Sequence, residues 1–288
     1  MSEKHIRGPY PEAAPAAIVD THCHLAISEF EEDRPEVLHR ARRAGVRWFI
    51  HAGTNHEDSA DAIALARKHR DVKVAVGFHP RWIGHRPLDW TLRLEQLTSA
   101  PEVVAVGEIG LDYYRRSDNK PAQKEAFRSQ LDLAAARGLP VIIHCRNAWE
   151  DVTAILCRWQ ESTEFRDSPL AQRPVRGVLH AFSGQPSHVR TAGDLGFMIG
   201  LGGPVTFLNA RDVHALVPRL PLAQLLLETD CPYLAPHPHR GRRNEPALLP
   251  LVCARIAELR GRTAIEVANV TTANALRCFG LPQPVPAT

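Results

Sequence analysis

Eight short apolar runs with β-strand character alternate along this chain with longer segments of helical periodicity, and this alternation limits the folds available to it. The strand candidates are Ala17–Cys23, Trp48–Ala52, Val72–Phe78, Val103–Ile109, Val141–Cys145, Gly177–Ala181, Gly196–Leu201 and Leu225–Thr229. Helical patterns lie at Arg34–Ala44, Asp58–Lys68, Lys120–Arg137, Trp149–Gln160, Arg211–Val217, Ala247–Arg260 and Ala264–Phe279. Repeated strand–helix units predict a parallel sheet covered by helices.

Eight such units within about 250 residues are typical of a TIM (β/α)8 barrel. The main rival is a doubly wound open sheet, which would carry a glycine-rich phosphate-binding turn after its first strand. No such turn follows Cys23, and no linker interrupts the middle of the chain. We therefore expect one α/β barrel domain over residues 16–280, with a flexible N-terminal tail at 1–15 and a C-terminal tail at 281–288.

The composition indicates an ordinary globular protein, because 44% of its 288 residues are hydrophobic and 23% are charged. A formal net charge of +3 is too small to indicate nucleic-acid binding by itself. The six cysteines include no CxxC pair, and neither a signal peptide nor a run of about 18 apolar residues is present. These features predict a cytoplasmic protein with free thiols, bound to no membrane.

The first strand candidate closes on Asp20-Thr21-His22-Cys23-His24. Successive side chains of a strand point to opposite faces, so His22 and His24 share one face with Asp20 below them, and Cys23 points away. Two imidazoles on one face form half of a metal site.

Several later strand candidates also close on polar side chains that can bind metals or move protons. These are His79, Glu108, His144, His180 and Asp230. In a barrel the carboxyl ends of all strands meet at one rim, where reacting groups lie. A single histidine at a strand end is more often structural, but buried carboxylates are rare unless they are paired or metal-bound.

Four imidazoles and two carboxylates exceed the three protein ligands of one catalytic zinc site, so we predict two divalent ions. The expected ligands are His22, His24 and Asp230 for the first ion, His144 and His180 for the second, and Glu108 between them.

Taken together, these motifs resemble the signatures of the TatD family of metal-dependent deoxyribonucleases, within the amidohydrolase superfamily. They are Asp-x-His-x-His, Gly-Phe-His-Pro, Gly-Glu-Ile-Gly-Leu-Asp-Tyr, Ile-Ile-His-Cys-Arg, His-Ala-Phe-Ser-Gly and Glu-Thr-Asp-Cys-Pro-Tyr-Leu-Ala-Pro, within Ile18–Phe279. The resemblance implies a TIM barrel, divalent metals and hydrolysis of DNA phosphodiester bonds by a 3′→5′ exonuclease. All six ligand positions match. Cys23 and His51 depart from the pattern; we expect Cys23 to face the surrounding helices and assign His51 no metal role.

Three catalytic positions follow for this reaction. Asp230 is the candidate for orienting and deprotonating the attacking water, or it is a ligand only, and Glu108 would lie between the ions. His79 would hold the scissile phosphate or protonate the leaving group, or pack structurally. Asp20 and Glu228 lie one strand step below ligands, where we expect them to orient those ligands.

Substrate binding needs cations and stacking surfaces beside the metals. The segment after the eighth strand, which resembles an Arg-Gly-x-Arg-Asn-Glu-Pro segment of the family, offers Arg240, Arg242, Arg243 and Asn244. Tyr113, Arg146 and Phe182 follow strands four, five and six. The expected partner is DNA, as single strands or 3′ ends, with no obligate protein partner.

Two other functions stay open. One is a hydrolase of a small cyclic amide, lactone or phosphoester, although many dinuclear relatives place a carboxylated lysine where this chain has Glu108. The other is a non-catalytic metal-dependent binding protein. The metal is also open among Zn, Mn, Mg, Ni and Co: imidazole suits Zn, Mn, Ni or Co, whereas Mg prefers oxygen.

Overall fold

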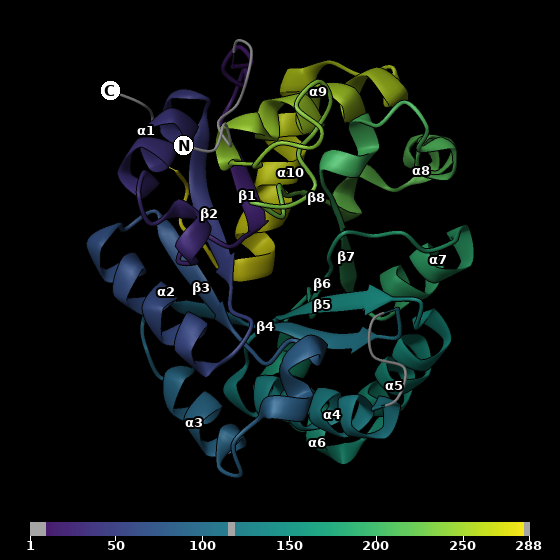
Figure 1. Cartoon of the computed structure of the whole chain (residues 1–288). Helices are drawn as coiled ribbons and strands as arrows, with labels where there is room; N and C mark the ends of the chain where they lie inside the picture. Colours follow the sequence, from purple (N-terminus) through teal and green to yellow (C-terminus); the bar gives the residue numbers. More distant parts are fainter. Residues whose placement is uncertain (1–9, 115–118, 285–288) are drawn as a thin grey trace. The chain divides into compact units, whose positions relative to one another are not determined.

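The computed structural model describes residues 10–114 and 119–284 (Figure 1). Contacts divide these described residues between two compact units. The first comprises residues 10–51, 200–277 and 281–284, and the second comprises residues 52–114, 119–199 and 278–280. The predicted tails at 1–15 and 281–288 lie partly outside the described residues, so their flexibility stays a prediction.

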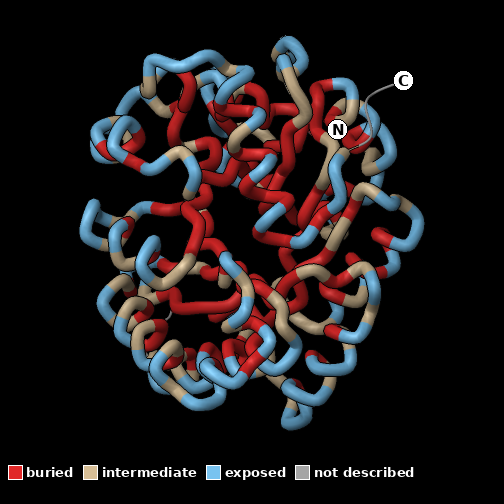
Figure 2. The backbone as a smooth tube through the Cα atoms, turned by 180° about the vertical axis from the view of Figure 1, so that it is seen from behind, coloured by how far each residue is buried: buried red, intermediate tan, exposed pale blue. Residues whose placement is uncertain are grey.

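All eight predicted strands are present. They are β1 (Ile18–Cys23), β2 (Val46–Ala52), β3 (Val72–Val76), β4 (Val103–Asp112), β5 (Val141–Arg146), β6 (Gly177–Leu179), β7 (Phe197–Leu201) and β8 (Leu225–Leu227). The sheet order follows the chain order, and the strand pairings are parallel. The strands are among the segments coloured as buried in Figure 2, which explains their nearly continuous apolar sequences.

The helices include three that the sequence did not predict: α3, α6 and α7. The observed set is α1 (Arg34–Arg43), α2 (His56–Lys68), α3 (Trp90–Leu97), α4 (Lys120–Arg137), α5 (Trp149–Glu161), α6 (Thr163–Arg166), α7 (Pro186–Asp194), α8 (Arg211–Leu216), α9 (Leu249–Arg260) and α10 (Ala264–Phe279). Helix α7 lacks the usual capping residues; instead, the backbone N–H of Gln185 donates to Nδ1 of His188 at 3.0 Å. None of the helices among the described residues is long and apolar enough to cross a membrane.

In the first unit, the segment after β8 runs beside the end of β1. The N–H of Asp230 donates to the carbonyl of His22 at 2.8 Å, and the N–H of His24 donates to the carbonyl of Cys231 at 2.9 Å. The hydroxyl of Thr21 donates to the carbonyl of Leu227 at 2.9 Å. These bonds fix the β1 histidines beside Asp230, although about 200 residues of sequence separate them.

In the second unit, β4 extends beyond the predicted Ile109 to Asp112 and pairs closely with β5. Gly110 lies opposite His144, and the N–H of His180 donates to the carbonyl of Ile143 at 3.1 Å. Gly110 has φ +135°, and a Cβ built there would strike the carbonyl oxygen of His144. Only glycine therefore allows the two strands to approach this closely beside the histidine.

Candidate metal centre

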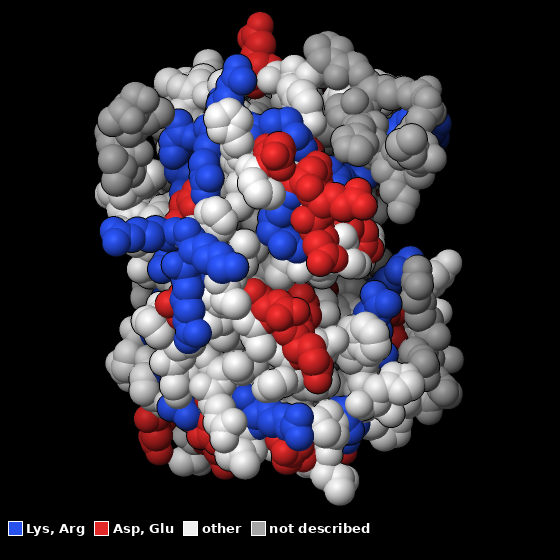
Figure 3. Space-filling view, turned by 60° about the vertical axis from the view of Figure 1, so that its left-hand side comes forward, with Lys and Arg blue, Asp and Glu red and all other residues white. Residues whose placement is uncertain are grey.

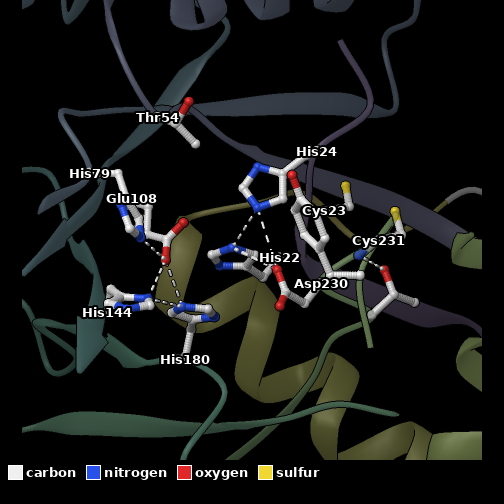
Figure 4. Close-up of polar contacts among 12 residues, drawn as sticks. His22, Cys23, His24, Thr54, His79, Glu108, His144, His180, Asp230 and Cys231 are labelled. Carbon is white, nitrogen blue, oxygen red and sulfur yellow. Dashed lines mark hydrogen bonds and ion pairs between the residues drawn. The ribbon is translucent and has the colours of Figure 1, made fainter. Parts of the chain in front are cut away.

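Three donor side chains meet in the first unit, and we call His22, His24 and Asp230 the first cluster (Figure 4). The Nε2 atoms of His22 and His24 lie 3.3 Å apart. Oδ1 of Asp230 lies 3.7 Å from Nε2 of His22 and 3.4 Å from Nε2 of His24. Both imidazoles are buried, whereas the Asp230 side chain remains 15% exposed. Water could therefore reach the cluster from the carboxylate side.

The spacing of this cluster fits a divalent ion. Donor atoms separated by 3.3, 3.7 and 3.4 Å have a common centre about 2.0 Å from each. That radius matches the bonds of about 2.0–2.2 Å that zinc forms with imidazole nitrogen and carboxylate oxygen. Two nitrogens and one oxygen turned toward one point form a donor set suited to borderline cations, so these residues fit the predicted first metal.

Asp20 contacts the first cluster through the backbone. Its Oδ1 accepts from the N–H groups of His22 (3.3 Å) and Thr229 (2.9 Å), and its Oδ2 accepts from the Thr229 hydroxyl at 2.6 Å. Burial raises the pKa of Asp20 to about 7. Asp20 thus links the two backbone segments that carry the ligands. Among the described residues, its carboxylate accepts from backbone N–H groups and a hydroxyl, and not from an imidazole of the cluster. Glu228, its predicted counterpart, is buried as expected.

The turn that carries Asp230 is held in an unusual conformation. Asp230 has φ +57°, a left-handed value that aspartate tolerates better than most residues. The Asn244 side-chain amide donates to the carbonyls of Thr229 at 2.8 Å and Tyr233 at 2.7 Å, on both sides of Asp230. Strained residues persist where surrounding contacts determine them fully, and Asn244 supplies such contacts.

Arg243 forms an ion pair with a carboxylate of the first unit. It donates to both carboxylate oxygens of Asp33, at 2.8 and 2.6 Å. Its neighbour Glu245 is buried and accepts two bonds from Arg40, at 2.9 and 2.8 Å. Bidentate pairs of this kind are strong and orient their partners. The DNA contacts expected of Arg243 and Asn244 stay predictions, while the structure gives both side chains a role in holding the loop.

In the second unit, two imidazoles lie close to one carboxylate oxygen of Glu108. We call Glu108, His144 and His180 the second cluster (Figure 4). Oε1 of Glu108 lies 2.8 Å from both Nδ1 of His144 and Nε2 of His180. Those two nitrogens are 3.3 Å apart. The nearly equal short distances suit either hydrogen bonds or shared coordination of one cation, so these residues fit the predicted second metal.

His79 and Asp112 extend the second cluster. Nε2 of His79 lies 3.5 Å from Oε1 of Glu108, and its Nδ1 accepts from the N–H of Arg81 at 3.0 Å. The accepting Nδ1 places the ring hydrogen on Nε2. Burial lowers the pKa of His79 to about 3, so the ring is neutral. Asp112, which the sequence did not single out, lies 3.4 Å from Nε2 of His144.

The predicted substrate-binding side chains after β4, β5 and β6 differ in how much they contact other parts of the protein. The hydroxyl of Tyr113 donates to Asp151 at 2.7 Å, and the ammonium of Lys120 lies 4.3 Å from its ring centroid. Phe182 is buried and packs edge-on against Trp149, 4.8 Å between centroids. Arg146, by contrast, is exposed.

Arg240 and Arg242 follow β8 in the first unit. The Arg240 guanidinium is exposed, lies 4.3 Å from the ring centroid of Phe207 and donates to Asn209 at 3.4 Å; Arg242 is half-buried. Basic and acidic side chains both lie on the face drawn in Figure 3, in keeping with the small net charge.

The two departures from the motif pattern have structural contacts. The Cys23 thiol donates to the carbonyl of Ile50 at 3.4 Å, so the neighbouring strand β2 holds it. Nδ1 of His51 accepts from the N–H of Ala26 at 3.3 Å, and its ring lies edge-on to that of His24.

Parallel strand–helix units with histidine–carboxylate clusters at the strand ends are typical of metal-dependent hydrolases built on a TIM barrel. Residues 19–280 match the family model described as TatD related DNase. The chain belongs to the TatD family. The crystal structure of YJJV, a TatD homologue from Escherichia coli K12, is 34% identical and superposes with a TM-score of 0.84, covering 92% of this chain and 98% of that one. The predicted TIM-barrel fold class is thereby confirmed.

Two relatives of similar identity carry different functional descriptions. The uncharacterized metal-dependent hydrolase YabD of Bacillus subtilis is 38% identical over 265 residues, covering 91% of this chain and 98% of that protein. The 3′-5′ ssDNA/RNA exonuclease TatD of Erwinia tasmaniensis is 36% identical over 272 residues, covering 91% of this chain and 99% of that protein.

Proposed function

We propose that this protein is a divalent-metal-dependent deoxyribonuclease that removes nucleotides from the 3′ ends of single-stranded or frayed DNA. The observation that carries the metal dependence is the first cluster, whose three donor atoms share a centre at bonding distance. The nuclease activity is supported by the 36% identical relative named as a 3′-5′ ssDNA/RNA exonuclease. A cytoplasmic location stays a prediction.

The two clusters supply the ligands in this proposal: His22, His24 and Asp230 for one ion, and His144, His180 and Glu108 for the other. A bound divalent ion lowers the pKa of water toward neutrality and stabilises charge on phosphoryl oxygens. That Glu108 bridges both ions stays a prediction. Their nitrogen-rich donor sets favour Zn, Mn, Ni or Co over Mg.

Asp230 and His79 have complementary roles in the proposed reaction. Asp230 is the most exposed member of its cluster and is the group positioned to orient the attacking water and accept its proton. Nε2 of His79 carries a hydrogen and can donate it to a phosphate oxygen. Burial keeps the His79 ring neutral by lowering its pKa to about 3, and a neutral imidazole is too weak an acid to protonate a leaving group. Of the two functions expected for His79, holding the phosphate is therefore favoured.

The proposal is tested by incubating the protein with end-labelled DNA across Zn, Mn, Mg, Ni and Co, with EDTA as the control. We expect stepwise loss of nucleotides from 3′ ends, abolished by EDTA and by His144→Ala or Asp230→Ala. Circular dichroism should show that both variants remain folded. A metal-replete protein that is inert on DNA but hydrolyses small esters, lactones or amides would instead identify the small-molecule alternative.

A further inference from the structure

An exposed arginine and an exposed tyrosine lie together in the second unit, just beyond the second cluster. The Arg146 guanidinium lies 4.0 Å from the ring centroid of Tyr114, and the Tyr114 residue is 62% exposed. Both side chains are thus accessible, and their contact is a cation–π interaction. We call Arg146 and Tyr114 the Arg–Tyr pair.

The backbone fixes this pair relative to the metal ligands. Arg146 lies opposite Asp112 in the β4–β5 pairing, and its carbonyl accepts from the N–H of Tyr113 at 2.9 Å. Two residues along β5 from His144, Arg146 points to the same face of the strand, about 6.6 Å further along. The pair therefore lies next to the second cluster, at a distance that one nucleotide can span.

The charge of Arg146 is not compensated within the described part of the chain. Arg243 and Arg40 are both held by carboxylates, at 2.6 and 2.8 Å. Over residues 10–114 and 119–284, Arg146 has no ion pair with a carboxylate. Its guanidinium retains donors in the planar fork that suits a phosphate group.

The neighbouring aromatic residues are less available for stacking. Tyr113 is fixed through its hydroxyl by Asp151, and Lys120 covers its ring. Phe182 is buried against Trp149. Tyr114 is consequently the aromatic side chain in this region that is most accessible to a base.

We propose that the Arg–Tyr pair binds the nucleotide adjacent to the scissile phosphodiester, an inference that rests on the proposed function. Arg146 pairs with the phosphate of that nucleotide, and Tyr114 stacks on its base. Stacking on a protein ring requires a base that has left its duplex, so this subsite selects single strands over paired ends. Every base has a π-face, so the subsite accepts any of the four bases.

The test compares metal-loaded variants on three substrates: a single-stranded oligonucleotide, the blunt duplex of the same sequence, and the p-nitrophenyl ester of thymidine 5′-monophosphate. The last substrate has no adjacent nucleotide. The readouts are the kcat/KM ratios of single strand to nucleotide ester and of single strand to duplex. The variants are Tyr114→Ala, Tyr114→Phe and Arg146→Ala.

Arg158→Ala is the matched control, because it removes one exposed positive charge from the last turn of α5. Nine residues of helix place Arg158 about 13 Å from Trp149, where α5 begins after β5. Arg158 therefore lies away from the Arg–Tyr pair, and both ratios should match those of the unaltered protein.

Tyr114→Ala should lower both ratios about tenfold, whereas Tyr114→Phe should retain them. Arg146→Ala should lower the ratio of single strand to nucleotide ester and reduce the slope of log kcat/KM against log salt by about 0.7 for one lost phosphate contact. Unchanged ratios in Tyr114→Ala would overturn the proposal.

Failure of the proposed function gives a different result, because the unaltered protein would then cleave neither DNA substrate, whether or not it hydrolyses the nucleotide ester. In that case, the Kd of the labelled single strand, measured by fluorescence anisotropy, tests whether the subsite binds a nucleotide. A Kd that rises about tenfold in Tyr114→Ala supports the subsite, and an equal Kd refutes it.

Discussion

The carboxylate of Asp112 lies 3.4 Å from Nε2 of His144, while Nδ1 of the same ring faces Glu108 at 2.8 Å. The imidazole is thus held between two carboxylates, one within the second cluster and one outside it. A carboxylate behind a ligating histidine fixes the ring orientation and increases the basicity of the coordinating nitrogen. We therefore assign Asp112 a positioning role.

Asp112→Asn is expected to weaken metal binding at the second cluster about 10- to 100-fold, because the amide cannot provide the same negative charge. Titration against a chromogenic chelator measures the affinity. The side-chain oxygen of asparagine can still accept from the N–H of Tyr114, a bond of 2.9 Å, so the fold should survive. Asp194→Asn, at an exposed position on α7, serves as the control. Equal affinities in the two variants would remove Asp112 from the site.

Among the secondary-structure elements, the close spacing of β4 and β5 fixes the position of His144. Gly110 occupies the pairing position opposite His144 with a positive φ and has no room for a Cβ. The glycines of the Gly-Glu-Ile-Gly motif therefore serve strand packing as well as chain flexibility.

Gly110→Ala should lower the free energy of unfolding by at least about 1–3 kcal/mol, because it adds left-handed strain and a clash with the carbonyl of His144. Thermal denaturation monitored by circular dichroism measures the effect. Gly84→Ala is a suitable control, since a Cβ at Gly84 has no heavy atom within 4 Å. If both variants melt at the same temperature, the packing explanation fails.

The loop after β8 is held against the start of α1 by the ion pair between Arg243 and Asp33. The hydrogen bond from Arg243 holds the pKa of Asp33 below its usual 3.8. A carboxylate whose folded pKa is lowered stabilises the fold above its unfolded pKa, and this contribution is lost as the pH falls through the folded value.

Asp33→Asn should therefore lower the melting temperature at pH 7, and the difference from the unaltered protein should shrink below about pH 4. Arg243→Ala combined with Asp33→Asn should cost less than the sum of the single changes, because the two side chains form one interaction. Strictly additive effects, with DNA affinity lost in Arg243→Ala alone, would instead favour the sequence-based assignment of Arg243 to DNA binding.

Considering the whole molecule, each cluster holds buried polar side chains together with one partly exposed member, Asp230 in the first and His144 in the second. Ligands that bind only the folded state stabilise it by mass action, and the donor atoms of each cluster come from segments that only folding brings together. Metal should therefore contribute to stability as well as to activity.

Removing metal with EDTA is expected to lower the melting temperature by about 5 °C or more relative to protein with metal at 100-fold the Kd, a stabilisation of about 2.7 kcal/mol. Differential scanning calorimetry before and after adding Zn or Mn measures the shift. A variant with both His22→Ala and His144→Ala should show a much smaller response. An equal response in that variant would place the bound metal elsewhere.

Local sequence patterns were enough to predict the eight strands, most of the helices and the polar side chains at the strand ends. Apolar runs and helical periodicity are local patterns, and they report which face of an element is buried. Helix α7 was not predicted, because its N-terminal cap uses the side chain of His188, and histidine is an unusual residue at that capping position. The type of fold could be inferred because repeated strand–helix units admit few architectures.

Which side-chain atoms lie in contact became known from the folded chain. It joined Asp112 to His144, turned Nδ1 of His79 toward the N–H of Arg81, and paired Arg243 with Asp33 across about 210 residues. These contacts depend on strand register and on loop conformation, which residues far apart in the chain determine together. A strand-end histidine or a loop arginine has the same local sequence whether it binds a ligand or another side chain, so its partner becomes known only when the chain is folded.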